Sequence, residues 1–166
     1  MSFLQIRTFK KGDYLLQAGK ICSHKHFILE GLVKTSYLED SGTERIVQFA
    51  LENWWVLDWE SFVHEKPATT SIQALEATRT LTIDKASLED AYQKIPKLES
   101  LFRKITENWL IAVQRNKKYM MASSQVRYNT LVKSLPNIVQ RVPQYMLASY
   151  LDITPEYLSE LRKKHS

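Results

Sequence analysis

The residues that could perform chemistry are few, and they do not form a complete set. His24 and His26 are two positions apart, as on one face of a strand, and could together contact a metal ion. No carboxylates or thiols complete such a site, and Cys22 is the only cysteine of the chain. We therefore interpret both histidines as solvent-exposed side chains, and we expect no metal and no cofactor.

Motifs typical of enzymes are missing from the sequence. It contains no glycine-rich loop that could cradle phosphates and no nucleophile elbow. A single cysteine excludes an internal disulfide and any site that needs several thiolates from one chain. We therefore do not expect an enzyme.

The net charge of +5 is unevenly distributed along the chain. Residues 1–95 hold 11 Lys and Arg against 13 Asp and Glu, whereas residues 96–166 hold 12 against 5. This asymmetry favours a polyanionic partner for the C-terminal part, with nucleic acid first and acidic protein second. A solvated helical face is the simpler alternative.

The composition is that of a folded domain. The 166 residues are 44% hydrophobic and include four Trp and eight Tyr, which can fill a core. No apolar stretch approaches the roughly 20 residues that a membrane span requires, and the first residues lack the apolar region of a signal peptide. We therefore expect a cytoplasmic protein without a membrane partner.

The first half of the chain predicts strands. Residues 9–83 consist of short β-branched and aromatic runs, broken by turn signals at intervals of about ten residues, as in an antiparallel barrel or jelly roll. Residues 51–62 break this pattern with three tryptophans, and a short helix can follow a strand there. Such a cluster favours core or interface packing, with a small-ligand site as the alternative. A helix is expected over residues 85–94.

Residues 96–123 carry the only sustained helical hydrophobic period. Pro96 suits the first turn of a helix, where its missing N–H costs nothing. Residues along one side recur at alternating spacings of three and four, which is the seam of a coiled coil, and an asparagine in such a seam can fix the register of two helices. A helix packed only on its own domain is the alternative. The predicted dimer interface consists of Leu98, Phe102, Ile105, Trp109, Ala112, Asn116 and Tyr119.

The remaining segment predicts short helices. One is expected over residues 124–135, and Pro136 should end it. Two more are expected over residues 144–151 and 155–164, joined by the turn 152–154. This is the layout of a DNA-binding helix-turn-helix, although an ordinary helical hairpin gives the same pattern.

The order of these elements resembles the Crp/Fnr family of bacterial transcription regulators over nearly the whole chain. The likeness rests on FKKGD at 9–13 with Gly19, on FILEGLVK at 27–34 and on the stretch 142–164. It implies a homodimer that senses a small molecule in its roll and binds a two-fold DNA operator, with RNA polymerase as a further partner.

The resemblance implies an α+β fold in three parts. Residues 1–95 would form the antiparallel β-roll, or jelly roll, of a cyclic-nucleotide-binding-like sensor domain. Residues 96–123 would be a long dimerisation helix, and residues 124–166 a DNA-binding helix-turn-helix domain. The β-hairpin wing and the usual leading helix of the family have no counterpart in this sequence.

The effector pocket that the resemblance implies is degenerate. Family members that bind cyclic AMP use a Gly-Glu pair for the ribose and an Arg-Ser or Arg-Thr pair for the cyclic phosphate, and no arginine stands at the matching positions here. We therefore expect no useful affinity for cyclic AMP. The effector is unknown, and a less charged or aromatic-compatible ligand is the expectation if there is one. The residues of this pocket are Trp55, Leu57, Asp58, Trp59, Thr69 and Thr70.

The resemblance also implies which residues meet DNA. Glu156 would accept a hydrogen bond from a cytosine, as in relatives, and the basic residues 162–164 would contact phosphates. Glu160 stands where relatives usually carry a basic residue, and two carboxylates oppose binding. The alternative function is therefore a dimeric small-molecule sensor or adaptor that has lost specific DNA binding. The implied DNA-binding residues are Thr154, Glu156, Tyr157, Glu160, Arg162, Lys163 and Lys164.

Overall fold

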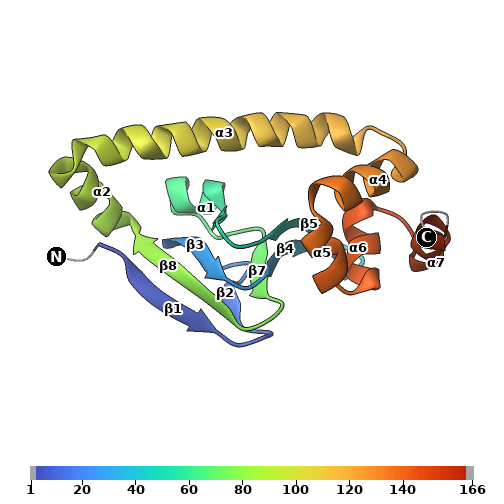
Figure 1. The fold of residues 1–166 in the computed structure, drawn as a ribbon. Helices are drawn as coiled ribbons and strands as arrows, with labels where there is room; N and C mark the ends of the chain where they lie inside the picture. Colours follow the sequence, from blue (N-terminus) through green and yellow to red (C-terminus); the bar gives the residue numbers. More distant parts are fainter. Residues whose placement is uncertain (1–2, 164–166) are drawn as a thin grey trace. The chain divides into compact units, whose positions relative to one another are not determined.

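The structure is a computed structural model of the chain and describes residues 3–163. Its contacts divide the chain into two compact units, residues 1–89 and residues 90–166. The first unit holds all the strands of the described residues, and the second is helical (Figure 1).

The strands of the first unit form two four-stranded antiparallel sheets. One sheet has the order β1-β8-β3-β6 and the other β2-β7-β4-β5, so most neighbouring strands are distant in the sequence (Figure 1). This arrangement is an antiparallel β-sandwich, as the strand spacing predicted. The strands are β1 (Gln5–Phe9), β2 (Tyr14–Leu16), β3 (His24–Glu30), β4 (Val33–Leu38), β5 (Glu44–Ala50), β6 (Trp55–Val56), β7 (Ser71–Ala74) and β8 (Thr78–Asp84).

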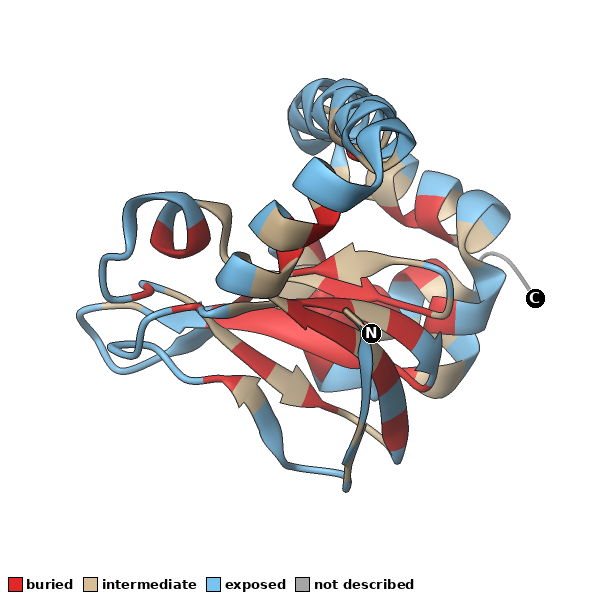
Figure 2. Cartoon of the chain, turned by 90° about the vertical axis from the view of Figure 1, so that its left-hand side faces the viewer, coloured by how far each residue is buried: buried red, intermediate tan, exposed pale blue. Residues whose placement is uncertain are grey.

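The core of the sandwich lies between the two sheets, where the strands are coloured as buried in Figure 2. Ile28, Leu32 and Ile72 have no exposed surface. Gly31 lies at a tight junction before β4, with a φ of +112° that residues other than glycine rarely adopt. A Cβ there would lie 2.8 Å from the Cα of Thr78, so the backbone approach itself requires glycine.

The interior of the sandwich also contains polar side chains. His26 is 3% exposed, and its Nδ1 lies 3.0 Å from the hydroxyl oxygen of Thr82 and 3.4 Å from that of Thr80. His24 is half-buried, with its Nε2 2.9 Å from a guanidinium nitrogen of Arg7. The expectation of two solvent-exposed histidines is therefore wrong for His26, because this side of β3 faces the core. No group of three or more metal-ligating side chains occurs within residues 3–163.

Two helices accompany the strands. The short helix α1 (Trp59–His64) follows β6, in the segment where the sequence pattern breaks. The helix α2 (Lys85–Lys94) has the bounds that the sequence predicted, and it contains the boundary between the two units. Asp84 precedes α2, and its Oδ1 accepts a hydrogen bond of 2.8 Å from the main-chain nitrogen of Ser87.

The second unit continues with five helices within the described residues: α3 (Pro96–Met120), α4 (Ser124–Ser134), α5 (Pro136–Arg141), α6 (Gln144–Leu151) and α7 (Pro155–Lys163). The helix α3 begins at the predicted proline and ends three residues before the predicted end. Among the described residues, none of the helices α1 to α7 has both the length and the apolar character to cross a membrane.

The helix α5 was not predicted. Pro136 does end α4, but it also occupies the first position of α5, where the missing N–H breaks no hydrogen bond. The main-chain nitrogen of Leu135 still donates to the carbonyl of Leu131 at 2.8 Å, so the two helices follow one another directly. Ile138 is 2% exposed, and α5 therefore contributes to the core of the second unit.

The helices α6 and α7 are joined by the three-residue turn 152–154 and pack on each other through apolar side chains. Asp152 adopts a left-handed conformation with φ of +52°, and the main-chain nitrogen of Ile153 donates to the carbonyl of Ala148 at 3.0 Å. The contact between these helices is buried, and Ile153 of the turn is half-buried. Exposure is at most 1% for Leu147, Ala148, Leu151, Leu158 and Leu161.

Candidate functional site

Asp58, a residue of the predicted effector pocket, is held by hydrogen bonds from its own loop. Its Oδ1 accepts from the main-chain nitrogen of Ser61 at 3.0 Å, which caps the first turn of α1. Its Oδ2 accepts from the hydroxyl of Thr70 at 2.7 Å. Both carboxylate oxygens therefore already have donors from within residues 58–70.

Ser61 fixes the same loop from inside. Its hydroxyl accepts a hydrogen bond from the main-chain nitrogen of Cys22 at 2.8 Å and donates to the carbonyl of Lys66 at 2.5 Å. Burial raises the pKa of the Cys22 thiol, which is therefore held as a neutral, weakly reactive group. No local pattern in the sequence points to Ser61, because its partners are distant in the sequence or are main-chain groups.

The aromatic residues of the predicted pocket contact side chains of β3. Trp55 lies against Phe27, with ring centroids 5.2 Å apart. The ammonium group of Lys25 lies 4.8 Å from the ring centroid of Trp59 and 5.1 Å from that of Phe62. Lys25 is 7% exposed, and its burial lowers the pKa of its ammonium group. The contacts of Lys25 attach α1 to the sheet.

Lys25 was not predicted either. The alternation of residues in β3 is the signal that could have found it, because Lys25 lies between two histidines that face the opposite side of the sheet. Of the six predicted pocket residues, a hydrogen bond joins Asp58 to Thr70. Leu57 is half-buried, and Thr69 is exposed.

The predicted seam of α3 is covered only in part. Phe102 is buried and meets Tyr92 of α2 edge-to-face, with ring centroids 5.9 Å apart. Every residue from 107 to 118 is exposed, and the long helix is coloured as exposed over most of its surface in Figure 2. Of the other seam residues, Leu98, Ile105 and Tyr119 are half-buried, whereas Trp109, Ala112 and Asn116 are exposed.

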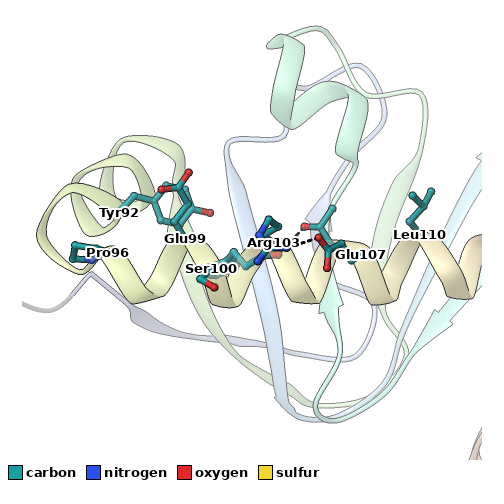
Figure 3. A pocket seen from close by; sticks show the side chains of 9 residues that line it. Tyr92, Pro96, Glu99, Ser100, Arg103, Glu107 and Leu110 are labelled. Carbon is teal, nitrogen blue, oxygen red and sulfur yellow. Dashed lines mark hydrogen bonds and ion pairs between the residues drawn. The ribbon is translucent and has the colours of Figure 1, made fainter.

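A groove of about 660 Å³ adjoins this seam along the first half of α3 (Figure 3). An ion pair of 2.6 Å between Arg103 and Glu107 lies along it. The groove combines aromatic and aliphatic surface with exposed charges, so the apolar surface of α3 extends beyond the predicted seam. Its lining residues are Tyr92, Pro96, Glu99, Ser100, Phe102, Arg103, Thr106, Glu107 and Leu110.

Tyr119, at the end of α3, is bound to the following helix of its own chain. Its hydroxyl donates a hydrogen bond of 2.5 Å to the main-chain carbonyl of Arg127 in α4. Burial, with a smaller effect from the nearby Tyr150, raises the pKa of Tyr119 to about 12. This hydrogen bond ties the last turn of α3 to α4.

The helix α7 presents its predicted DNA-binding residues in different ways. Glu156, Tyr157, Glu160 and Lys163 are exposed, whereas Arg162 is half-buried. Thr154, just before the helix, accepts a hydrogen bond of 3.2 Å on its hydroxyl from the main-chain nitrogen of Tyr157. Lys164 lies outside the described residues.

The sequence of the first unit matches a family model. Residues 6–95, more than half of the chain, match the model described as "Cyclic nucleotide-binding domain". The chain belongs to the cyclic nucleotide-binding domain family. The matched span includes the whole sandwich except the first residue of β1, together with α1 and α2. No curated protein sequence matches the chain significantly.

Solved structures of Crp/Fnr regulators share the fold of this family member. FixK2 from Bradyrhizobium japonicum is 13% identical with a TM-score of 0.78, over 97% of this chain and 83% of that one. A mutant of CooA from Carboxydothermus hydrogenoformans is 14% identical with a TM-score of 0.74, over 97% and 75%. The Thermus thermophilus catabolite activator protein is 14% identical with a TM-score of 0.54, over 98% and 78%. At these identities the matches show that the chain shares the fold of these regulators, as the resemblance predicted.

The family model covers the loop 58–70, in which the resemblance predicts the residues for the cyclic phosphate and one of the two for the ribose. In this chain the loop contains no arginine, and the carboxylate of Asp58 is hydrogen-bonded within the loop itself. A cyclic phosphate placed there would have no bidentate guanidinium partner.

Proposed function

We propose that this chain is a homodimeric, DNA-binding transcription regulator of the Crp/Fnr type whose β-roll does not bind cyclic AMP. The division into a sensor roll (residues 1–95), a dimerisation helix (96–123) and a DNA-binding helix-turn-helix (124–166) is part of this proposal. The observation that carries it is the combination, in one unit, of a long exposed apolar helix with the helix pair α6 and α7.

The exposure of α3 supports dimerisation. Leu101, Leu110 and Val113 are between 42% and 52% exposed, and Trp109 is 37% exposed. Large apolar side chains gathered along one helix destabilise a monomer in water, and a second copy of the same helix would cover them. Asn116 would meet its counterpart in the seam and fix a parallel register, at some cost in stability.

The helix pair supports DNA binding. Leu158 and Leu161 are buried against α6, so the opposite side of α7 is free to enter a groove. Arg162 and Lys163, in the last turn, would meet phosphates. Lys164 has the same role in this proposal and lies outside the described residues. A dimer of this kind would bind a two-fold operator, so the protein would act in the cytoplasm, with RNA polymerase as a further partner.

The loop 58–70 supports the proposal that the pocket does not accept cyclic AMP. A phosphate buried there would lose its contacts with water and gain no charged hydrogen bond. The small-molecule effector of the roll is therefore a different compound, if the roll binds one.

A dimeric sensor or adaptor without DNA binding is the second candidate. Glu156 and Glu160 are both exposed on α7, and their negative charges repel phosphates. This function keeps the dimer and the sensor roll but gives α7 a partner that is not nucleic acid.

Capture of genomic DNA fragments by the purified chain distinguishes the two functions. At about 100 mM salt a DNA-binding dimer should retain fragments, and Lys163→Glu should weaken retention because it reverses an exposed charge of α7. The matched control is Lys11→Glu, which makes the same change at an exposed turn of the roll and should leave retention unchanged. If the wild type retains nothing, the adaptor is the better account.

A further inference from the structure

The exposed surface of α7 differs in its hydrogen-bonding capacity between its two ends. Glu156 and Glu160 are the charged residues exposed in its first two turns, and the cations Arg162 and Lys163 come only in the last turn. An ionised carboxylate accepts hydrogen bonds and cannot donate them. The end of the helix that would enter a groove first therefore carries charged acceptors and no charged donors.

We infer that α7 recognises exocyclic amino groups of bases, with Glu160 as a second reading residue one turn after Glu156. This inference rests on the proposed DNA-binding function and specifies what that function reads. The chemical class of ligand is a DNA half-site that presents two amino groups, from cytosine or adenine, in the major groove.

The packing of α7 fixes which residues face outward. Leu158 and Leu161 have no exposed surface, and they anchor the helix against α6. Glu156 and Glu160 are four residues apart and therefore share a face, on the side away from this anchor. The hydroxyl of Thr154 accepts from the main-chain nitrogen of Tyr157, which holds the start of the helix in place.

The major groove offers donors at only some positions. Cytosine presents its N4 amino group and adenine its N6 amino group, whereas guanine O6 and N7 and thymine O4 are acceptors that repel a carboxylate. A helix of this surface would therefore discriminate against guanine and thymine at the positions it reads. The exposed Tyr157 adds one hydroxyl that can donate or accept.

The spacing of the two carboxylates limits the spacing of the two amino groups. Four residues of helix rise about 6 Å, whereas successive base pairs are about 3.4 Å apart. The two amino groups should therefore belong to adjacent base pairs or to base pairs that have one other base pair between them. The carboxylates also lower the affinity for phosphates in general, which lowers non-specific binding relative to binding at a matching half-site.

Selection from a random DNA pool, carried out in parallel with the wild-type chain and with Glu160→Gln, tests the inference. The wild type should select cytosine or adenine at two such positions. Because the amide of glutamine can also donate, Glu160→Gln should relax the preference at one position by about tenfold and leave the other unchanged. Glu99→Gln, an exposed carboxylate of α3, is the matched control and should select the wild-type sites.

A base analogue gives a second measurement that does not depend on a variant. The base to replace is a cytosine selected at the position where Glu160→Gln relaxes the preference. An analogue without the N4 amino group at this position should weaken wild-type binding by about tenfold and leave binding by Glu160→Ala unchanged. DNA binding with the same base preferences in the wild type, Glu160→Gln and Glu160→Ala would overturn this inference alone. Absence of any DNA binding by the wild type at low salt would overturn the proposed function together with it.

Discussion

The hydroxyl of Thr70 donates a hydrogen bond of 2.7 Å to Oδ2 of Asp58 and so closes the loop in which the family resemblance predicts the nucleotide site. Calorimetric titration with cyclic AMP should therefore show no binding in the micromolar range. The loop 58–70 contains no arginine that could pair with the cyclic phosphate. The loss of such a charged partner removes about 1.5–3 kcal/mol of favourable interaction, and burying the phosphate unpaired costs more.

A gain-of-function variant provides the control for this prediction. Leu57→Gly with Thr69→Arg introduces the glycine and arginine that the family resemblance assigns to cyclic AMP binding, and Thr69 is exposed, so an arginine there has room. This double variant should bind more tightly than the wild type. Micromolar binding by the wild type itself would contradict the proposed pocket.

Trp109→Glu should convert the protein to monomers, because the substitution would place a charge in the predicted seam of α3. Trp109 is 37% exposed within the single chain, so the folded monomer should tolerate the change. Sedimentation velocity gives the oligomeric state. Ile111→Glu is the matched control: Ile111 is 46% exposed, but it lies on the other side of the same helix. Loss of the dimer in both variants, or in neither, would place the interface elsewhere.

His26 should make the roll less stable in mild acid. Burial, followed by smaller effects from His24 and Arg7, lowers the pKa of His26 to about 3, against about 6.5 in an unfolded chain. The unfolded state therefore binds more protons below pH 6.5, and stability is lost as the pH falls toward 3. Between pH 6.5 and 5 the free energy of unfolding should fall by about 2 kcal/mol.

Urea unfolding at several pH values measures this effect. The pKa of the half-buried His24 is also lowered, mainly by burial, and adds loss in the same direction. His26→Asn, whose amide can replace Nδ1 in the bonds to the threonine hydroxyls, should flatten the slope over this range. His64→Asn, at an exposed position of α1, should keep the wild-type slope. Equal slopes for wild type and His26→Asn would show that His26 is not the titrating group.

Regular elements could be predicted because their signals are local. The period of α3, the bounds of α2 and the pair α6 and α7 follow from hydrophobic spacing and from the positions of Pro96 and Pro155. The helix α5 was missed because Pro136 both ends one helix and begins the next, and proline alone does not distinguish these roles.

The contacts of the candidate site could not be predicted in the same way. The bond from the main-chain nitrogen of Cys22 to Ser61 joins residues 39 positions apart, and only the pairing of the strands brings them together. Alternation along β3 places Lys25 and His26 on opposite faces. It does not show that α1 covers Lys25, because that depends on the path of the chain after β6.

The hydrogen bond from Tyr119 to the carbonyl of Arg127 should stabilise the second unit. Tyr119→Phe removes the donor, keeps the ring, and should lower the free energy of unfolding of this unit by about 1 kcal/mol. Hydrogen exchange at the start of α4 should become faster in the same variant. Tyr145→Phe, where the side chain is 61% exposed, is the control and should change neither quantity. An unchanged exchange rate in Tyr119→Phe would show that this bond does not hold α4 to α3.

The central claim is that two copies of this chain bind one DNA site, and titration of the purified protein onto a selected fragment over a range of salt concentrations tests it most directly. We predict two chains per fragment and a binding constant whose logarithm falls linearly with the logarithm of the salt concentration. Lys163→Glu should make the slope shallower by about 1.8, because each of the two subunits would neutralise one phosphate fewer and each phosphate contributes about 0.9. One chain per fragment, or no binding even at low salt, would contradict the claim.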